Sequence, residues 1–327
     1  MKKNMGYMFV VLVIVLAASY LGYQGFESRS IEADQLPEIK YVNFRVYDPV
    51  YVGVDRGLFE KHGVSVNIIG DVLAGPTAIQ AVSAGEAQAG LSSIPAIINA
   101  NLAGLPIQGV SDIQSALEGQ PLEYYYTRCD SGIKTIEDLK GKDFAVNLWY
   151  SSFHYTAIME LEKAGMTEED VNFILMSFPN QIPALIAGEV DVIGLMEPYN
   201  GMAAAQFADQ ICLLFDANDT FGNKQFTLHF VNRIWAENNP EEAAAFVAGI
   251  VEAIDWIENN QDEAKQIIAE YTEIPAEFVP EYHFQNNGMV IVEDVQFWYD
   301  YMTAASEADQ WLDLESIATN QYNAAAE

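Results

Sequence analysis

The residues best suited to chemistry are polar and aromatic side chains that directly follow apolar runs. Ser151, Ser152 and His154 follow one such run, and Glu197 follows another. Hydroxyl and carboxylate groups make hydrogen bonds and aromatic rings cover flat or apolar groups, so these types suit the binding of a small polar molecule. A catalytic triad does not follow from this spacing, because a triad needs a base that a third group orients in space.

The full set of candidates shares one property: each residue is expected at the carboxyl end of a strand or the start of a helix. In open α/β sheets, ligands gather at that edge. The candidates are Tyr47, Asp48, Thr77, Ser92, Ser93, Trp149, Ser151, Ser152, His154, Glu197 and Tyr199. Structural alternatives stay open, since hydroxyls also cap helices and a histidine also packs in a core. Glu197 is harder to explain that way, because an acid that ends an apolar strand is costly unless it is exposed or paired.

The elements that must position these residues alternate along residues 51–101. The pattern predicts a short helix ending at Gly63, a strand over 64–69, a helix over 78–84 opened by Thr77, and a small-residue strand ending at Ser93. Pro95 suits the first turn of a further helix. Such alternation predicts α/β layers with a largely parallel sheet.

A second unit with the same logic begins near residue 131. Thr135 followed by Asp138 is a capping-box signature for a short helix. We expect strands over 143–148, 171–176 and 190–195, and helices over 153–164 and 181–187, the last closed by Gly188. Residues 239–305 predict mainly helices, and the aromatic residues 297–301 are expected in a core.

Composition and the amino end bound the class of protein. The 327 residues carry a formal charge of −32, which argues against nucleic acid or an anionic membrane surface as a partner. Residues 1–23 combine Lys2 and Lys3 with an apolar run, so they predict a signal peptide or an N-terminal membrane anchor. Residues 24–38 follow as a linker, and the rest is expected outside the cytoplasm, in the periplasm or at the cell surface.

Four segments carry a family resemblance: residues 57–66, 79–91, 130–146 and 182–199. Together they resemble the substrate-binding proteins of ABC importers for nitrate, sulfonates, taurine and thiamine pyrimidine precursors. The resemblance implies a type II periplasmic-binding-protein flytrap, with lobe 1 formed by residues 39–127 plus 225–327 and lobe 2 by residues 128–224. It implies hinges at residues 126–129 and 225–232. Ser152, His154 and Glu197 occupy positions that contact ligand in this family.

One loop differs in sequence from the pattern of the family, and this difference narrows the class of ligand. Many members have a glycine-rich loop before the helix of the second lobe, whereas residues 147–150 here are Asn-Leu-Trp-Tyr. Together with Glu197 and Tyr199, this loop favours a pyrimidine or thiamine-precursor-like heterocycle. An aliphatic sulfonate, taurine or nitrate stays open as an alternative, as does a membrane-anchored sensory binding domain.

The remaining expectations concern activity and partners. No HExxH, Walker or GxSxG motif occurs, so we expect a binding protein and no enzyme, with no cofactor and no metal. Pyrimidine-producing enzymes that share the fold use a cysteine-rich motif, whereas this chain has only Cys129 and Cys212, which form a disulfide or remain two thiols. We expect the protein to be a monomer whose partners are a small solute and an ABC permease.

Overall fold

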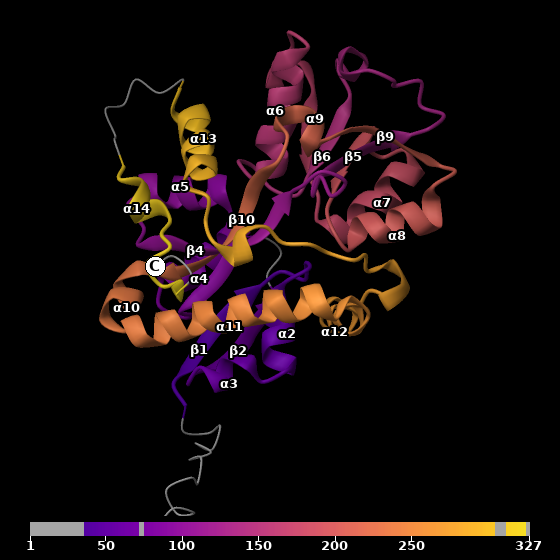
Figure 1. Ribbon diagram of the computed structural model, residues 1–327. Helices are drawn as coiled ribbons and strands as arrows, with labels where there is room; N and C mark the ends of the chain where they lie inside the picture. The colour runs from indigo at the N-terminus through magenta and orange to yellow at the C-terminus, as the bar shows by residue number, and fades with distance from the viewer. Residues whose placement is uncertain (1–35, 72–74, 305–311, 325–327) are drawn as a thin grey trace, which may run out of the picture. The chain divides into compact units, whose positions relative to one another are not determined.

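The computed structural model describes residues 36–71, 75–304 and 312–324, and those from Pro37 onward belong to one compact unit (Figure 1). The expectations for residues 1–23 lie outside the described residues, as does nearly all of the 24–38 linker. Over the described part of the chain, no helix has the length and apolar character needed to cross a membrane.

The first sheet has the strand order β2-β1-β3-β10-β4. Its strands are β1 (Glu38–Asn43), β2 (Ser65–Asp71), β3 (Ala89–Ser93), β4 (Ile107–Ala116) and β10 (Lys224–Asn232). Strand β1 pairs in parallel with β2 and β3, whereas β10 is antiparallel to both of its neighbours. Four strands therefore point one way and β10 points the other.

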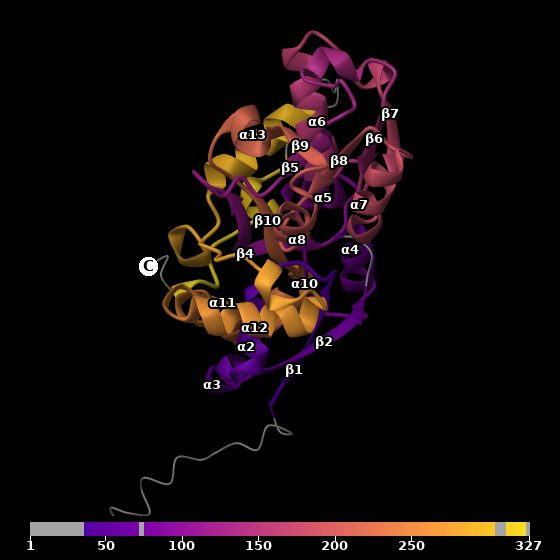
Figure 2. The ribbon, with the colours of Figure 1, turned by 90° about the vertical axis from the view of Figure 1, so that its right-hand side faces the viewer.

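The second sheet repeats this arrangement with the order β7-β6-β8-β5-β9 (Figure 2). Its strands are β5 (Tyr124–Arg128), β6 (Asp143–Val146), β7 (Asn172–Leu175), β8 (Val192–Leu195) and β9 (Ile211–Asp216). Strand β6 is parallel to β7 and β8, and β5 is antiparallel to β8 and β9. The prediction of two α/β lobes with mainly parallel sheets is confirmed, with one opposed strand in each sheet.

The expected boundary of the lobes after residue 127 is wrong, because the chain changes sheets earlier. Strand β5 was assigned to the first lobe, yet it pairs with β8 and β9 of the second sheet. The first crossing therefore lies in residues 117–123. The expected hinges are displaced for the same reason: residues 126–128 lie in β5 and residues 225–232 lie in β10, where hydrogen bonds to neighbouring strands restrict them.

Helices cover both sheets. In the first lobe they are α2 (Pro49–Asp55), α3 (Leu58–Lys61), α4 (Gly75–Ser83), α5 (Ile94–Leu102), α10 (Arg233–Asn238), α11 (Pro240–Asn259), α12 (Gln261–Thr272), α13 (Val292–Thr303) and α14 (Leu314–Ile317). In the second lobe they are α6 (Ser152–Lys163), α7 (Phe178–Ala187), α8 (Tyr199–Phe207) and α9 (Ala217–Phe221). The long helix α11 packs on α2 and α3 (Figure 1).

Local signals explain several helix ends. Thr135 and Asp138 form the predicted capping box, and Gly188 ends α7 in the left-handed conformation that glycine adopts most readily. Within the mainly helical region predicted over 239–305, residues 276–282 form only the single turn Ala276–Phe278. Pro280 follows that turn, and a proline there removes a backbone N–H and favours extended backbone before it.

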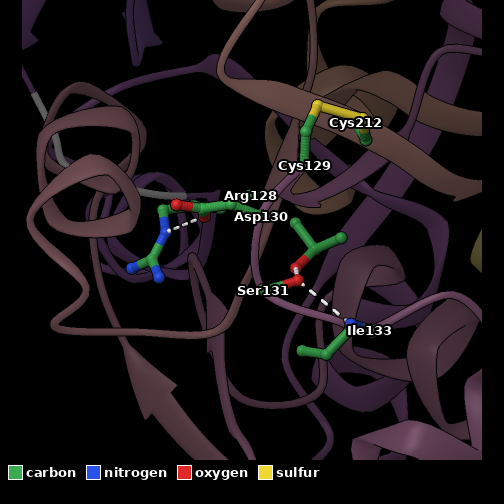
Figure 3. Close-up of a disulfide and its surroundings, with 7 residues drawn as sticks. Arg128, Cys129, Asp130, Ser131, Ile133 and Cys212 are labelled. Atoms are coloured by element: carbon green, nitrogen blue, oxygen red, sulfur yellow. Dashed lines mark hydrogen bonds and ion pairs between the residues drawn. A yellow bond between two sulfur atoms is a disulfide. The ribbon is translucent and has the colours of Figure 1, made fainter.

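A disulfide joins Cys129, directly after β5, to Cys212 in β9 (Figure 3). The register of the sheet explains the pairing, because Thr127 lies opposite Cys212 and the Cys129 N–H donates to the carbonyl oxygen of Gln210 at 2.9 Å. The sequence left a disulfide and two free thiols equally open, and the structure shows the disulfide.

Candidate ligand-binding site

A cavity lies where residues of the two lobes meet. Its lining combines hydroxyls, one carboxylate, one amide and apolar side chains: Phe44, Ser92, Ser93, Leu122, Glu123, Asn147, Leu148, Ser151, Ser152, Phe153, Met196 and Thr227. The free space inside it is about 30 Å³. That space suits one or two water molecules, whereas small-molecule pockets typically measure about 300–1,000 Å³. A solute therefore requires the lining to move apart.

The first lobe contributes Ser92 and Ser93 from the carboxyl end of β3. Ser93 is the N-cap residue of α5, and Pro95 stands in the first turn of that helix, as predicted. The Ser92 side chain is fully buried, and its Oγ has no hydrogen-bond partner among the described residues. A buried hydroxyl without a partner is costly, so this group is available to a bound molecule.

The second lobe contributes Ser151 and Ser152 from the start of α6. Ser151 is the N-cap: its Oγ accepts from the His154 N–H at 3.4 Å and lies 3.0 Å from the Asn147 amide oxygen, to which it can donate. Ser152 is the first residue of the helix, where backbone N–H groups have no intrahelical partner. The structure thus brings four predicted serines to one cavity.

Glu123 is the only charged side chain in this lining, and the candidate set did not include it. It is fully buried in the first crossing, and its Oε2 accepts from the Tyr125 hydroxyl at 2.8 Å. Burial raises the pKa of Glu123 to about 7, although the nearby hydroxyls of Ser152, Thr156 and Tyr125 oppose that rise. Its Oε1 has no hydrogen bond of good geometry to the described residues, although the Ser152 and Thr156 hydroxyls lie near the carboxyl group.

Asp48 and Tyr47, both predicted for the site, lie in the core of the first lobe instead of the cavity lining. Asp48 is the N-cap of α2 and accepts from the Tyr41 hydroxyl at 2.7 Å and from the Val50 N–H at 2.9 Å. The Nε2 atom of buried His229 lies 3.0 Å from Oδ1 of Asp48. Tyr47 stacks on Tyr282, with ring centroids 4.6 Å apart. Both side chains are fully buried.

Thr77 and Trp149 are also outside the cavity lining. Helix α4 begins at Gly75, so Thr77 is an exposed residue of the first turn and not the residue that opens the helix. Trp149 is 42% exposed and meets the His154 ring edge-on, with centroids 5.0 Å apart. Its position at the surface gives no direct support for stacking on a ligand in this cavity.

His154 does not line the cavity, and its ring packs against Phe173 of β7 with centroids 4.7 Å apart. Its Nδ1 accepts from the Tyr150 N–H at 3.1 Å, and burial lowers its pKa to about 4. The ring is therefore neutral at pH 7, and the Glu168 carboxylate 3.9 Å from Nε2 does not form an ion pair with it. This arrangement fits a packed histidine.

Glu197 and Tyr199 follow β8 as predicted, but their side chains are used internally. The Glu197 carboxylate accepts from the Asn200 Nδ2 at 2.8 Å and from the Gly201 N–H at 3.0 Å. Tyr199 stacks on Phe178, with centroids 5.7 Å apart. Glu197 thus pairs with the first turn of α8, which satisfies both oxygens of a buried carboxylate.

Five polar or aromatic lining residues were absent from the candidate set: Phe44, Glu123, Asn147, Phe153 and Thr227. Glu123 carried a readable signal, since it stands within the apolar stretch of residues 122–127 and a lone acid there is costly unless paired. Thr227 carried none, because β10 was expected to be a hinge. Across the described ranges, no group of three or more His, Cys, Asp or Glu residues is placed to hold a metal ion.

Two sheets that each contain one opposed strand, two crossings between them and a cavity lined from both lobes define a type II periplasmic-binding-protein fold. A family model described as NMT1/THI5 like matches residues 46–264, about two thirds of the chain. The chain belongs to this family. A binding protein of Brucella abortus (strain 2308) is 28% identical over 230 residues, which cover 68% of this chain and 67% of that protein.

Solved structures agree on the fold. The alkanesulfonate-binding protein SsuA from Xanthomonas axonopodis pv. citri, bound to MOPS, is 17% identical with a TM-score of 0.70, over 86% of this chain and 98% of that one. The nitrate-binding protein NrtA from Synechocystis PCC 6803 is 12% identical with a TM-score of 0.70, over 88% and 87%. The desulfurization enzyme DszB is 13% identical with a TM-score of 0.64, over 88% and 97%. The fold alone therefore does not separate binding from catalysis.

Proposed function

We propose that the protein is an extracytoplasmic solute-binding protein of an ABC importer, which closes on a small organic solute and delivers it to a membrane permease. The observation that carries the proposal is the cavity lined by serines of both lobes around Glu123. Ligand contacts from both sides give a solute a higher affinity for the closed arrangement, which is what drives closure in a two-lobe protein.

The solute class we favour is an amino-bearing heterocycle of the pyrimidine or thiamine-precursor type. Unpartnered acceptor and hydroxyl groups at Glu123 and Ser92 suit amino and ring-nitrogen groups, and Phe44 and Phe153 supply apolar cover. These residues take the ligand-binding roles that the sequence suggested for Glu197 and Trp149. The Glu197 carboxylate already accepts hydrogen bonds from the first turn of α8, and Trp149 lies at the surface.

A sulfonate or nitrate is the second candidate, and the start of α6 is the observation in its favour. Backbone N–H groups at the amino end of this 12-residue helix lie beside the cavity residues Ser151 and Ser152, and a helix amino end favours a negative group. The alkanesulfonate-binding relative in structure, SsuA, makes that class worth testing in parallel.

The test is a thermal-shift screen of the purified protein against 4-aminopyrimidine, thiamine, taurine, ethanesulfonate and nitrate, followed by calorimetry. A ligand at a hundred times its dissociation constant adds about 2.7 kcal/mol to the unfolding free energy, which raises the midpoint measurably. Sodium chloride at equal ionic strength is the control. If no compound raises the midpoint above that control, the proposed solute class is wrong.

A further inference from the structure

We infer that Glu123 determines the charge of the solute: the cavity accepts a molecule that brings a hydrogen-bond donor to this carboxylate and rejects oxyanions. This inference rests on the proposed solute-binding function and specifies its ligand. Glu123 lies at the cavity, is fully buried and keeps Oε1 without a partner among the described residues. A buried acceptor in that condition is stabilised by a donor from a ligand.

The backbone holds Glu123 between the first crossing and the start of α9. Its N–H donates to the Pro121 carbonyl oxygen at 2.8 Å within the first crossing, and its own carbonyl oxygen accepts from the N–H of Ala217, the first residue of α9, at 3.0 Å. The Tyr125 hydroxyl fixes Oε2 from the other side. The carboxylate is therefore held in place before a ligand arrives, as a specificity-determining group must be.

The charge balance of the lining points the same way. The residues that line the cavity include no lysine, arginine or histidine. Above about pH 7, where Glu123 is ionised, an oxyanion there would meet a buried carboxylate without a lining cation to offset the repulsion. An amino group would instead satisfy Glu123 Oε1, and the unpartnered Ser92 Oγ in the same lining can accept or donate a second hydrogen bond.

Two other buried acids show why Glu123 is distinctive. Glu197 has both carboxylate oxygens occupied by Asn200 and Gly201. Asp112 resembles Glu123 in burial, in an unpartnered oxygen and in a pKa raised to about 7, yet it does not line the cavity. Asp112 therefore provides a matched control, since its substitution changes a buried acid without changing the lining.

A protonated Glu123 that donates to an anion is the competing arrangement. The variant Glu123→Gln separates the two, because glutamine keeps the shape and a donor but loses the negative charge. If the ligand is an anion held by protonated Glu123, the glutamine variant keeps its affinity. If the ligand is an amine held by the carboxylate, the glutamine variant loses its affinity for that ligand.

The experiment measures the dissociation constants of 4-aminopyrimidine, pyrimidine, ethanesulfonate and nitrate by calorimetry for the wild type, Glu123→Gln and Asp112→Asn. We expect the wild type to bind 4-aminopyrimidine about tenfold or more tightly than pyrimidine, as a charge-assisted hydrogen bond implies. We expect this preference to shrink to less than about threefold in Glu123→Gln and to persist in Asp112→Asn. Circular dichroism verifies that each variant is folded.

A second measurement needs no variant. The titratable groups that act at this position are Glu123 itself, the Tyr125 hydroxyl on β5 and, beyond it, Glu160 on α6. Wild-type affinity for 4-aminopyrimidine should rise between pH 6.5 and pH 8.5, as Glu123 ionises. A flat or falling profile contradicts the inference even if Glu123→Gln does not fold.

The possible outcomes separate a failure of the role inferred for Glu123 from a failure of the proposed solute-binding function. Binding of ethanesulfonate or nitrate that Glu123→Gln leaves unchanged would overturn the role of Glu123 and leave solute binding intact. Equal affinity of the wild type for 4-aminopyrimidine and pyrimidine would do the same. If none of the four compounds binds, the inference and the proposed solute class both fail.

Discussion

At the scale of single residues, burial decides how the acids of this protein behave. Asp112 is fully buried in β4; Ser115 Oγ donates to its Oδ2 at 2.8 Å, while its Oδ1 has no partner among the described residues. Burial raises the pKa of Asp112 to about 7, and the nearby charge of Asp294 adds to that rise. Ionising this carboxyl in the folded state is therefore unfavourable.

This shift predicts a pH dependence of stability. An acid with a folded pKa near 7 and an unfolded pKa near 4 keeps its proton longer in the folded state, so stability falls as pH rises between these values. Asp112→Asn removes this effect. Between pH 4.5 and pH 8, the unfolding free energy of the variant should gain on the order of 3 kcal/mol relative to the wild type. Urea unfolding at several pH values measures the difference.

The outcome that counts against this prediction is a constant difference between the two proteins across the pH range. Glu263→Gln is a suitable control, because this carboxylate pairs with Arg56 at the surface and is 62% exposed. That substitution should alter stability by less than about 1 kcal/mol at any pH in the range.

The residue scale also shows how far the site could be predicted from sequence. Ser92, Ser93, Ser151 and Ser152 could be predicted to lie near one another because strand ends and helix starts are local patterns, and the structure places all four in the cavity lining. Asp48 does not line this cavity, because its environment is set by His229, 181 positions away in the chain. No local pattern contains such a contact, and only the tertiary structure shows that Asp48 is fully used in the core.

At the scale of elements, most helices and strands could be predicted, but their assignment to sheets could not. The predicted lobe boundary places nearly all of β5 in the first lobe, yet its partners β8 and β9 come much later in the chain. Strand β10 was missed as a strand altogether and was expected as a hinge. Antiparallel insertion into a distant sheet leaves no signature in a strand's own residues, so topology was the part that sequence periodicity could not supply.

The disulfide between β5 and β9 gives a prediction at this scale. It closes a segment of 83 residues, and cross-linking a loop of this length restricts the unfolded chain by up to about 4.5 kcal/mol in the chain-entropy model. We expect the double variant Cys129→Ser, Cys212→Ser to lose about 2–4 kcal/mol of unfolding free energy. Urea unfolding measures this loss.

The control is alkylation of the denatured wild type without reductant, which should label neither cysteine. Neither residue belongs to the cavity lining, so ligand affinity should be unchanged in the folded variant. An unchanged unfolding midpoint in the double variant would show that the link between β5 and β9 does not stabilise the second lobe.

At the scale of the whole molecule, the dominant property is charge. The chain has 47 acidic and 15 basic residues, and the formal charge is −32. Many of the few basic residues already form surface ion pairs, such as Arg56 with Glu263 and Lys61 with Glu252. The acidic residues outnumber the basic ones about three to one, and repulsion among the excess negative charges destabilises a compact state.

This imbalance predicts that salt stabilises the protein. At pH 7.5, raising sodium chloride from 20 mM to 500 mM shortens the Debye length from roughly 20 Å to about 4 Å, so repulsion between surface acids is screened. The thermal midpoint should rise by several degrees, to about the same extent with potassium chloride, because screening does not depend on the identity of the cation.

Near pH 4.1, where the net charge calculated from the sequence is zero, the same addition of salt should change the thermal midpoint much less. Differential scanning calorimetry at both pH values measures the two shifts. A midpoint that stays level or falls with salt at pH 7.5 would mean that favourable local pairs outweigh the excess of negative charge.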